Sequence, residues 1–146
     1  MSEDVDHGTA MPPQRVVGPG EAPFWAAIDA GTLALAHCAC GACYAQSQAC
    51  LACGAAAEAL HWAPAAGRAT LVSYVVFDKA YHAYFAARLP YVVAVVALVE
   101  GPELVTNVVE VAAAELAAGA LRIGMPLQLR VVRRDGQAIH EAVRAD

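Results

Sequence analysis

Residues 38–54 read CACGACYAQSQACLACG and hold all five cysteines of the chain. Four of them form two C-x-x-C pairs, Cys40 with Cys43 and Cys50 with Cys53. A C-x-x-C turn holds two thiolates close enough to share one tetrahedral Zn²⁺, and a second turn completes the site. The spacing therefore predicts a zinc ribbon with Cys40, Cys43, Cys50 and Cys53 as its ligands.

The ligand set has alternatives, because five cysteines compete for four positions. Only six residues separate the two C-x-x-C pairs, which is few for a hairpin. Using Cys38 in place of Cys43 leaves nine residues after Cys40 but makes the first turn C-x-C. His37 is a further possible ligand, although an ordinary surface position is the simpler interpretation. Four thiolates leave no open position on the metal, so the predicted zinc is structural and does no chemistry.

The sequence before and after the cysteines favours a helix and then strands. Residues 22–31 predict a short helix with Phe24, Trp25 and Ile28 on one face. Leucines alternating with alanine predict a short strand at residues 33–35. Later β-branched and aromatic runs predict strands at residues 70–77, 90–99, 104–109 and 127–132, and residues 112–121 favour a short helix or a loop. Short strands joined by turns, without crossover helices, indicate a small barrel.

The composition excludes several classes of protein. The chain has 146 residues, is 59% hydrophobic and carries a net charge of −5. So apolar a chain is not disordered. Its longest strongly apolar run, Tyr91–Val99, has nine residues, against about 20 for a membrane helix. A single lysine and scattered arginines disfavour nucleic-acid binding. Residues 1–20 lack the pattern of a signal peptide, so we expect a cytoplasmic protein.

The motifs occur in an order that resembles one known family. They are Phe24-Trp25, Gly31-x-Leu33-x-Leu35, the cysteine pairs ending in Cys53-Gly54, Pro90-Tyr91-Val92-Val93-Ala94, Thr106-Asn107 and Ile123-Gly124-Met125-Pro126. Over about residues 22–135 the chain resembles the acyl-CoA-associated OB-fold family with an N-terminal rubredoxin-like zinc ribbon, domain of unknown function thirty-five. The resemblance implies a mainly β fold. It divides the chain into a flexible segment 1–21, a helix plus zinc ribbon 22–62 and an OB-fold barrel 63–146.

The resemblance also implies a function. Members of this family accompany thiolase-like enzymes such as lipid-transfer-type thiolases, steroid side-chain aldolases and acyltransferases. By this resemblance the chain is a non-catalytic companion subunit in a hetero-oligomer of lipid or steroid metabolism. It would stabilise the catalytic chain and help to shape its acyl-CoA site, with acyl-CoA near the shared interface.

The residues themselves point to no catalytic set. No cysteine lies outside the cluster, so a thiolase-type nucleophile is missing, and there is no Gly-x-Ser-x-Gly elbow. After the cysteine cluster, His140 and Glu141 are the only histidine and carboxylic acid adjacent in the sequence. Neighbouring strand residues point to opposite faces, and we interpret this pair as solvated terminal residues.

Residues 78–85, DKAYHAYF, are the most distinctive stretch outside the cysteine cluster. Exposed aromatic side chains on a connection often mark an interface. Tyr81, His82, Tyr84 and Phe85 are therefore predicted to contact a partner protein or an acyl chain. The alternative is that these rings simply pack over the mouth of the barrel.

Two other functions stay open at this point. One is an OB-fold module that binds single-stranded nucleic acid, which the charge balance disfavours. The other is a free-standing acyl-CoA binder, which needs cations for the phosphates. The candidate cations are Arg68, Arg88, Arg130, Arg133 and Arg134.

Overall fold

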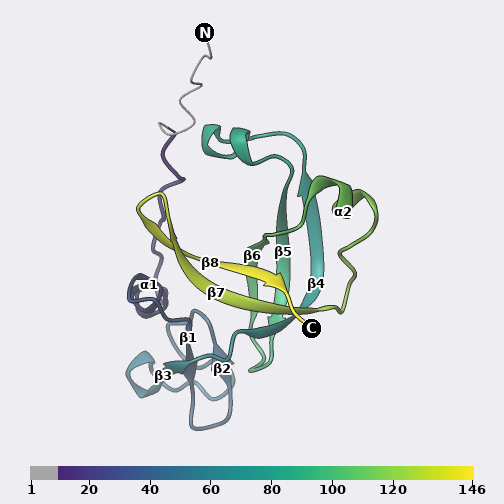
Figure 1. Ribbon diagram of the computed structural model, residues 1–146. Helices are drawn as coiled ribbons and strands as arrows, with labels where there is room; N and C mark the ends of the chain where they lie inside the picture. Colours follow the sequence, from purple (N-terminus) through teal and green to yellow (C-terminus); the bar gives the residue numbers. More distant parts are fainter. Residues whose placement is uncertain (1–9) are drawn as a thin grey trace.

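The computed structural model describes residues 10–146, so the first nine residues of the predicted flexible segment 1–21 lie outside the described part. A helix and a three-stranded sheet with the cysteines precede a closed barrel (Figure 1). The α-helices and strands are α1 Ala22–Asp29, β1 Ala34–His37, β2 Cys43–Tyr44, β3 His61–Pro64, β4 Arg68–Phe77, β5 Tyr91–Leu98, β6 Glu103–Val108, α2 Ala113–Ala117, β7 Pro126–Arg134 and β8 Gln137–Arg144. Two 3₁₀ turns, η1 Ala57–Ala59 and η2 Ala83–Arg88, complete the architecture. The predicted mainly β class with a short N-terminal helix is confirmed.

The small sheet has the order β2-β1-β3, with both neighbours antiparallel to β1. Strand β3 leads directly into the barrel through Gly67. The φ of Gly67 is +80°, and a Cβ there would lie 2.8 Å from the carbonyl oxygen of Leu129. The Gly67 carbonyl in turn accepts the Leu129 N–H at 2.7 Å. A side chain at this junction would therefore push the ribbon away from β7.

The barrel has the strand order β4-β5-β6-β8-β7, and β7 pairs with β4 to close it. Its neighbouring strands are antiparallel except for β6 and β8, which run parallel and meet at Val108 and Ala142. Strand β5 alternates strictly, with every second side chain from Val92 to Leu98 buried. One face of each strand thus lines the core, as in a five-stranded OB-fold.

Strand β8, like β2 and β3, is not among the strands predicted from the sequence. The two residues before it, Asp135 and Gly136, have φ values of 53° and 78°, the left-handed backbone that a two-residue hairpin turn of type I′ requires. The turn sets the register, so that Arg134 lies opposite Gln137 and Arg130 lies opposite Glu141. Strand β8 therefore forms part of the barrel wall.

One apolar core links the helix, the ribbon and the barrel. Phe24 and Ile28 of α1 are fully buried and belong to the same cluster as Leu35 of the ribbon and Leu71 and Val96 of the barrel. Helix α1 packs against β1 and β8. A second cluster inside the ribbon is much smaller and contains only Ala36, Cys38, Cys50 and Leu60 as buried residues. Within residues 10–146 no helix has the length and apolar character needed to cross a membrane.

Candidate functional site

Four cysteine sulfurs converge at the end of the ribbon. They belong to Cys38, Cys40, Cys50 and Cys53, and all lie within 4.8 Å of one another. The Sγ atoms of Cys38 and Cys53 are 3.6 Å apart, as are those of Cys40 and Cys50. Four ligands at the Zn–S distance of about 2.3 Å, arranged as a tetrahedron, have sulfurs about 3.8 Å apart. The spacing and the all-thiolate donor set therefore suit a tetrahedral metal ion.

Cys43 lies outside this group. The structure therefore brings together the alternative ligand set, in which Cys38 takes the place of Cys43. The register of β1 and β2 places Cys43 opposite His37, and its Sγ lies 3.9 Å from the His37 Nε2. Cys43 packs against the barrel side of the ribbon, where it lines a cavity of about 520 Å³ between ribbon and barrel. Cys38 and Cys40 instead lie at the turn between the two strands, which faces Cys50 and Cys53.

Backbone hydrogen bonds shape both cysteine turns. Gly41 N–H donates to the Cys38 carbonyl at 2.9 Å, and Gly54 N–H donates to the Cys50 carbonyl at 2.8 Å. Both glycines have positive φ values, of 98° and 78°, which lets each turn reverse tightly after a cysteine. The glycines that directly follow Cys40 and Cys53 thus help to determine where the two loops place the cysteine sulfurs.

Tyr44 supports the second turn from the side. Its hydroxyl accepts the Leu51 N–H at 2.9 Å and lies 3.5 Å from the Cys50 Sγ. The Tyr44 hydroxyl, followed by the backbone N–H of Cys53, lowers the pKa of Cys50 to about 6. Cys50 is therefore disposed to be a thiolate near neutral pH, which is the form that binds metal.

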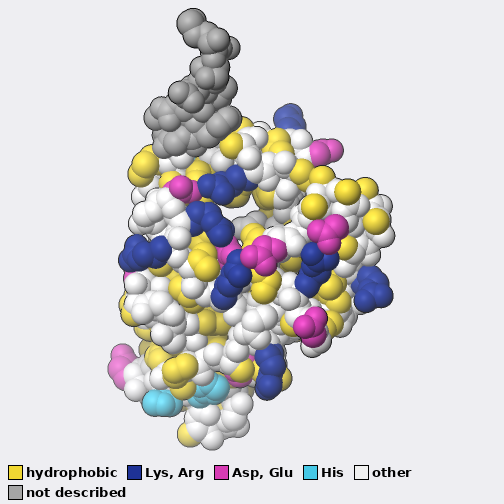
Figure 2. Space-filling view, in the orientation of Figure 1, with side chains coloured by type: hydrophobic (Ala, Val, Ile, Leu, Met, Phe, Trp, Pro, Cys, Tyr) yellow, Lys and Arg dark blue, Asp and Glu magenta, His cyan; other side chains and the backbone are white. Residues whose placement is uncertain are grey.

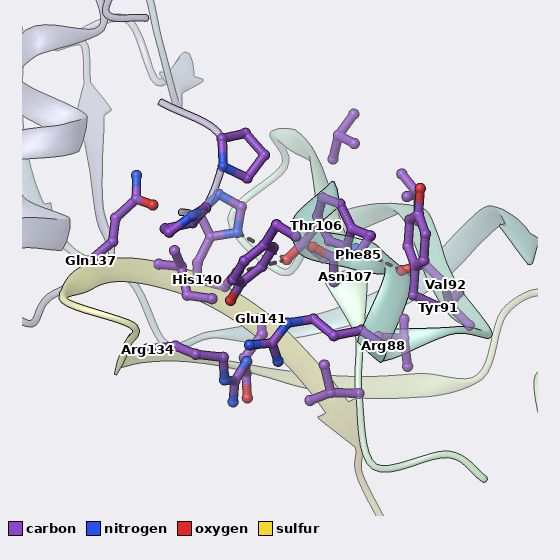
Figure 3. A pocket seen from close by; sticks show the side chains of 18 of the residues that line it. Phe85, Arg88, Tyr91, Val92, Thr106, Asn107, Arg134, Gln137, His140 and Glu141 are labelled. Atoms are coloured by element: carbon purple, nitrogen blue, oxygen red, sulfur yellow. Dashed lines mark hydrogen bonds and ion pairs between the residues drawn. The ribbon is translucent and has the colours of Figure 1, made fainter. Parts of the chain in front are cut away.

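A groove of about 730 Å³ lies on the barrel. It is enclosed by η2, β5, β6, β8 and residues 12–16 (Figure 3). Its aromatic wall is a stack of three rings. The ring centroid of Tyr91 lies 4.5 Å from that of Phe85 and 4.9 Å from that of Phe77. Ligand pockets of small molecules have volumes of about 300–1,000 Å³ and are mostly apolar, so this groove has the size and lining of a binding site.

The predicted aromatic stretch contributes to the groove only in part. Tyr84 and Phe85 line the groove, whereas Tyr81 and His82 do not. Tyr81 is 74% exposed. The His82 Nδ1 accepts the Tyr84 N–H at 3.1 Å and so begins η2.

Hydrogen bonds and an ion pair connect η2 to the β7–β8 turn at the rim of this groove. The Asp135 Oδ2 accepts the Tyr84 hydroxyl and the Arg88 Nη2, both at 2.6 Å. The Arg88 guanidinium also lies 4.2 Å above the Tyr84 ring. Two loops that are far apart in the sequence are thereby held together across the groove.

The interpretation of His140 and Glu141 as solvated terminal residues is wrong. Glu141 is fully buried, because β8 lies between β6 and β7 in the barrel wall. Arg130 donates to the Glu141 carboxylate at 2.9 and 2.7 Å, and Arg134 donates to its other oxygen. Burial alone would raise the pKa of Glu141, but the hydrogen bonds from Arg134 and Arg130 outweigh it and hold the pKa below its usual value.

His140 points the other way and belongs to the junction with α1. Its ring stacks on Trp25 at 5.7 Å, and its Nδ1 lies 2.9 Å from the Thr106 hydroxyl. Burial, with a smaller contribution from the charge of Arg15, lowers the pKa of His140 to about 4. His140 is therefore neutral at physiological pH.

Arg15 connects the segment before α1 to this junction. Its guanidinium lies 4.3 Å from the Trp25 ring, donates to the Ala138 carbonyl at 2.7 Å and pairs with Asp29 at 3.0 Å. Part of the predicted flexible segment 1–21 thus forms one wall of the groove.

The arginines around the groove are matched by carboxylates. Arg88 pairs with Asp135, and Arg130 and Arg134 pair with Glu141. Figure 2 shows this mixture, with Lys and Arg side chains interspersed with Asp and Glu over the side formed by β7 and β8. Three of the five candidate phosphate-binding arginines are therefore engaged within the chain.

The fold and the cysteine cluster define a protein class, an OB-fold barrel behind a four-cysteine ribbon. Residues 62–132 match the family described as ChsH2, C-terminal OB-fold domain. A solved structure described as "Ltp2-ChsH2(DUF35) aldolase" is 28% identical, with a TM-score of 0.75 over 91% of this chain and 100% of that chain. A search of curated proteins found no match. These two similarities confirm the predicted resemblance to the DUF35 OB-fold proteins.

Serine substitutions test the metal centre. We expect Cys38→Ser and Cys50→Ser to lose bound zinc and to melt at lower temperature, while Cys43→Ser keeps one zinc per chain and melts like the wild type. Structural zinc contributes about 10–16 kcal/mol of apparent binding free energy in small domains, so a missing ligand should unfold the ribbon. Metal analysis and thermal denaturation measure both effects. Zinc retained by Cys38→Ser and lost by Cys43→Ser would assign the other ligand set.

Replacement of Glu141 tests the buried ion pair. At pH 7 we expect Glu141→Gln to lower the free energy of unfolding by about 1–3 kcal/mol, because two arginines lose an ionised partner. The folded-state pKa of Glu141 is depressed. Its contribution is therefore complete above the unfolded pKa of about 4.3 and is lost as the pH falls through the folded pKa.

Urea denaturation at a series of pH values measures this difference, which should shrink on acidification. Glu58→Gln is the control, since Glu58 is exposed and has no ion pair within the described part of the chain. A difference between wild type and Glu141→Gln that stays constant down to the acid limit of folding would contradict the assignment.

Proposed function

We propose that this chain is a non-catalytic companion subunit of a thiolase-like enzyme. Its proposed roles are to stabilise that enzyme and to help shape its acyl-CoA site, in the cytoplasm and in lipid or steroid metabolism. The observation that carries the proposal is the similarity, over 91% of this chain, to a chain of the structure described as an Ltp2-ChsH2(DUF35) aldolase. A likeness of this extent includes both the ribbon and the barrel.

The groove supports the acyl-CoA part of the proposal. Its walls combine the ring stack of Phe77, Tyr91 and Phe85 with apolar side chains such as Val105 and Ile139. Such a lining favours a hydrocarbon chain or a flat apolar ring system over a strongly charged group. The groove would then hold part of the acyl substrate while the partner supplies the reactive groups.

The charges around the groove weigh against the two alternatives. Nucleic acids and the phosphates of CoA are bound by cations that are free to neutralise them. Arg88, Arg130 and Arg134 already pair with carboxylates of this chain. A phosphate bound by these three arginines would compete with the pairs, which leaves Arg68 and Arg133 as the other candidate cations.

We also propose that the four-cysteine cluster holds structural zinc. The support is the donor set and the sulfur spacing of 3.6 Å within each close pair. The buried cluster of the ribbon is small, so a metal crosslink would supply stability that its apolar contacts lack. The proposed zinc would have only protein ligands and no role in the partner's chemistry.

Co-purification tests the companion role. We expect the affinity-tagged full-length chain, expressed in its native host, to recover one thiolase-like protein in a fixed ratio, identified by mass spectrometry. Mixing the two purified proteins should raise the melting temperature of the partner. A chain that comes out alone under these conditions, or with nucleic acid, would overturn the proposed function. A tagged unrelated OB-fold protein serves as the control for non-specific capture.

A matched pair of aromatic variants tests the groove. In the reconstituted complex we expect Phe85→Ala to lower kcat/KM for the acyl-CoA substrate about 10–150-fold, which corresponds to about 1.5–3 kcal/mol of apolar burial. Tyr81→Ala is the control, because Tyr81 belongs to the same segment but lies outside the groove. Steady-state kinetics, with melting curves to verify folding, measure both. Equal effects of the two variants would exclude the groove as the acyl site.

A further inference from the structure

The outer face of strands β4, β5 and β6 is apolar. The strand register places Val75 beside Val93 and places Val95 between Ser73 and Val105. Alternate residues of these strands, such as Ala94 and Val96, point into the core. The first set therefore points outward together, since side chains of neighbouring strands at one register position share a face.

This face contains almost no charge. Residues 69–77, 91–99 and 104–109 include no Asp, Glu, Lys or Arg, and the charged residues of these strands, Arg68 and Glu103, occupy the first positions of β4 and β6. By contrast, the β7–β8 side carries Arg130, Arg134 and Glu141 and is crowded with charged groups in Figure 2. The two sides of one small barrel thus differ sharply in the kind of surface they can meet.

Little of the part of the chain that the structure describes, residues 10–146, covers this face. Val75 is 57% exposed and Val105 is 63% exposed. Helix α1 packs against β1 and β8, and η2 reaches only one end of the face, where Phe85 stacks on Tyr91. An uncovered sheet face with several valines is a feature of binding surfaces, because isolated soluble domains seldom leave contiguous apolar area in water.

We propose that this face, defined by Ser73, Val75, Val93, Val95, Val105 and Asn107, is the docking surface for the thiolase-like partner, which meets it with an uncharged, apolar surface. This inference rests on the proposed function and adds to it the place of contact. The chemistry of the occupant follows from the face itself, since a charged partner surface would lose its hydration here without gaining an ion pair.

The position of the face relative to the groove also favours the enzyme partner over other occupants. Val93, Val105 and Asn107 belong to the face and also line the groove. A protein seated on the face would therefore extend to the groove and border any chain bound there. A ligand held in the groove would then lie at the boundary between the two subunits.

Charged substitutions on the face test this proposal. The partner recovered in the co-purification experiment is titrated with wild-type chain, Val75→Asp and Val105→Asp, and the dissociation constants are measured by calorimetry. An ionised carboxylate in the centre of an apolar interface should weaken binding at least about thirtyfold. Ile123→Asp is the matched control, because Ile123 is a comparably exposed apolar residue in the turn before β7. Val105→Thr keeps the β-branched shape without charge and should bind more tightly than Val105→Asp.

Each outcome has a distinct meaning. Weak binding of both Asp variants, with normal binding of Ile123→Asp and unchanged melting curves and zinc content, supports the docking surface. Wild-type affinity in both Asp variants overturns it but leaves the companion role intact. Failure of the wild-type chain to bind any thiolase-like protein overturns the proposed function and this inference with it. If light scattering shows a wild-type homodimer that Val75→Asp dissociates, the occupant is a second copy and the proposal is wrong.

Discussion

The two-residue turn of Asp135 and Gly136 fixes the register of the last hairpin, and both the closure of the barrel and the walls of the groove depend on that register. It places Arg130 opposite Glu141 and brings Ala142 to Val108, where β8 pairs with β6. A slip of one residue would exchange the two faces of β8. The buried carboxylate would then enter the apolar core, and the His140 ring would leave its stack on Trp25. The turn also holds η2, because Asp135 accepts hydrogen bonds from Tyr84 and Arg88.

The ribbon depends on a different kind of constraint. Its own buried cluster consists of one alanine, one leucine and two of the four clustered cysteines. A unit of this size rarely buries enough apolar surface to fold alone. Two further sources of order compensate for this. Phe24 and Ile28 join the ribbon side of the chain to the barrel core, and the four converging sulfurs offer a metal crosslink at the opposite end. The ribbon is thus held at both ends, while Gly67 permits its close approach to β7.

The sequence predicted the helix, the barrel class and the metal-type cluster because each has a local signal. Residues 22–29 show helical spacing, β5 shows a strand-like run, and C-x-x-C spacing is specific. Two features, the choice among the five cysteines and the Arg130–Glu141 ion pair, were not predicted because they depend on the pairing of strands. The register of β1 and β2 sets Cys43 opposite His37 and leaves the cluster to Cys38. The Arg130–Glu141 pair required the hairpin turn to be recognised. The dipeptide Asp135-Gly136 carried that signal, since residues equidistant from it become cross-strand neighbours.

The ion pairs around the groove bear on the proposed role as a companion subunit. The arginines named at its rim are matched by carboxylates, so the groove itself offers little to a phosphate group. Its aromatic stack and valines can enclose an apolar chain, while His140 is buried against Trp25 and Glu141 is held by two arginines. Under the proposed function, the partner enzyme supplies the chemistry and the contacts to a charged head group. A chain that presents an apolar groove next to an uncharged sheet face is suited to completing a site that a larger enzyme begins.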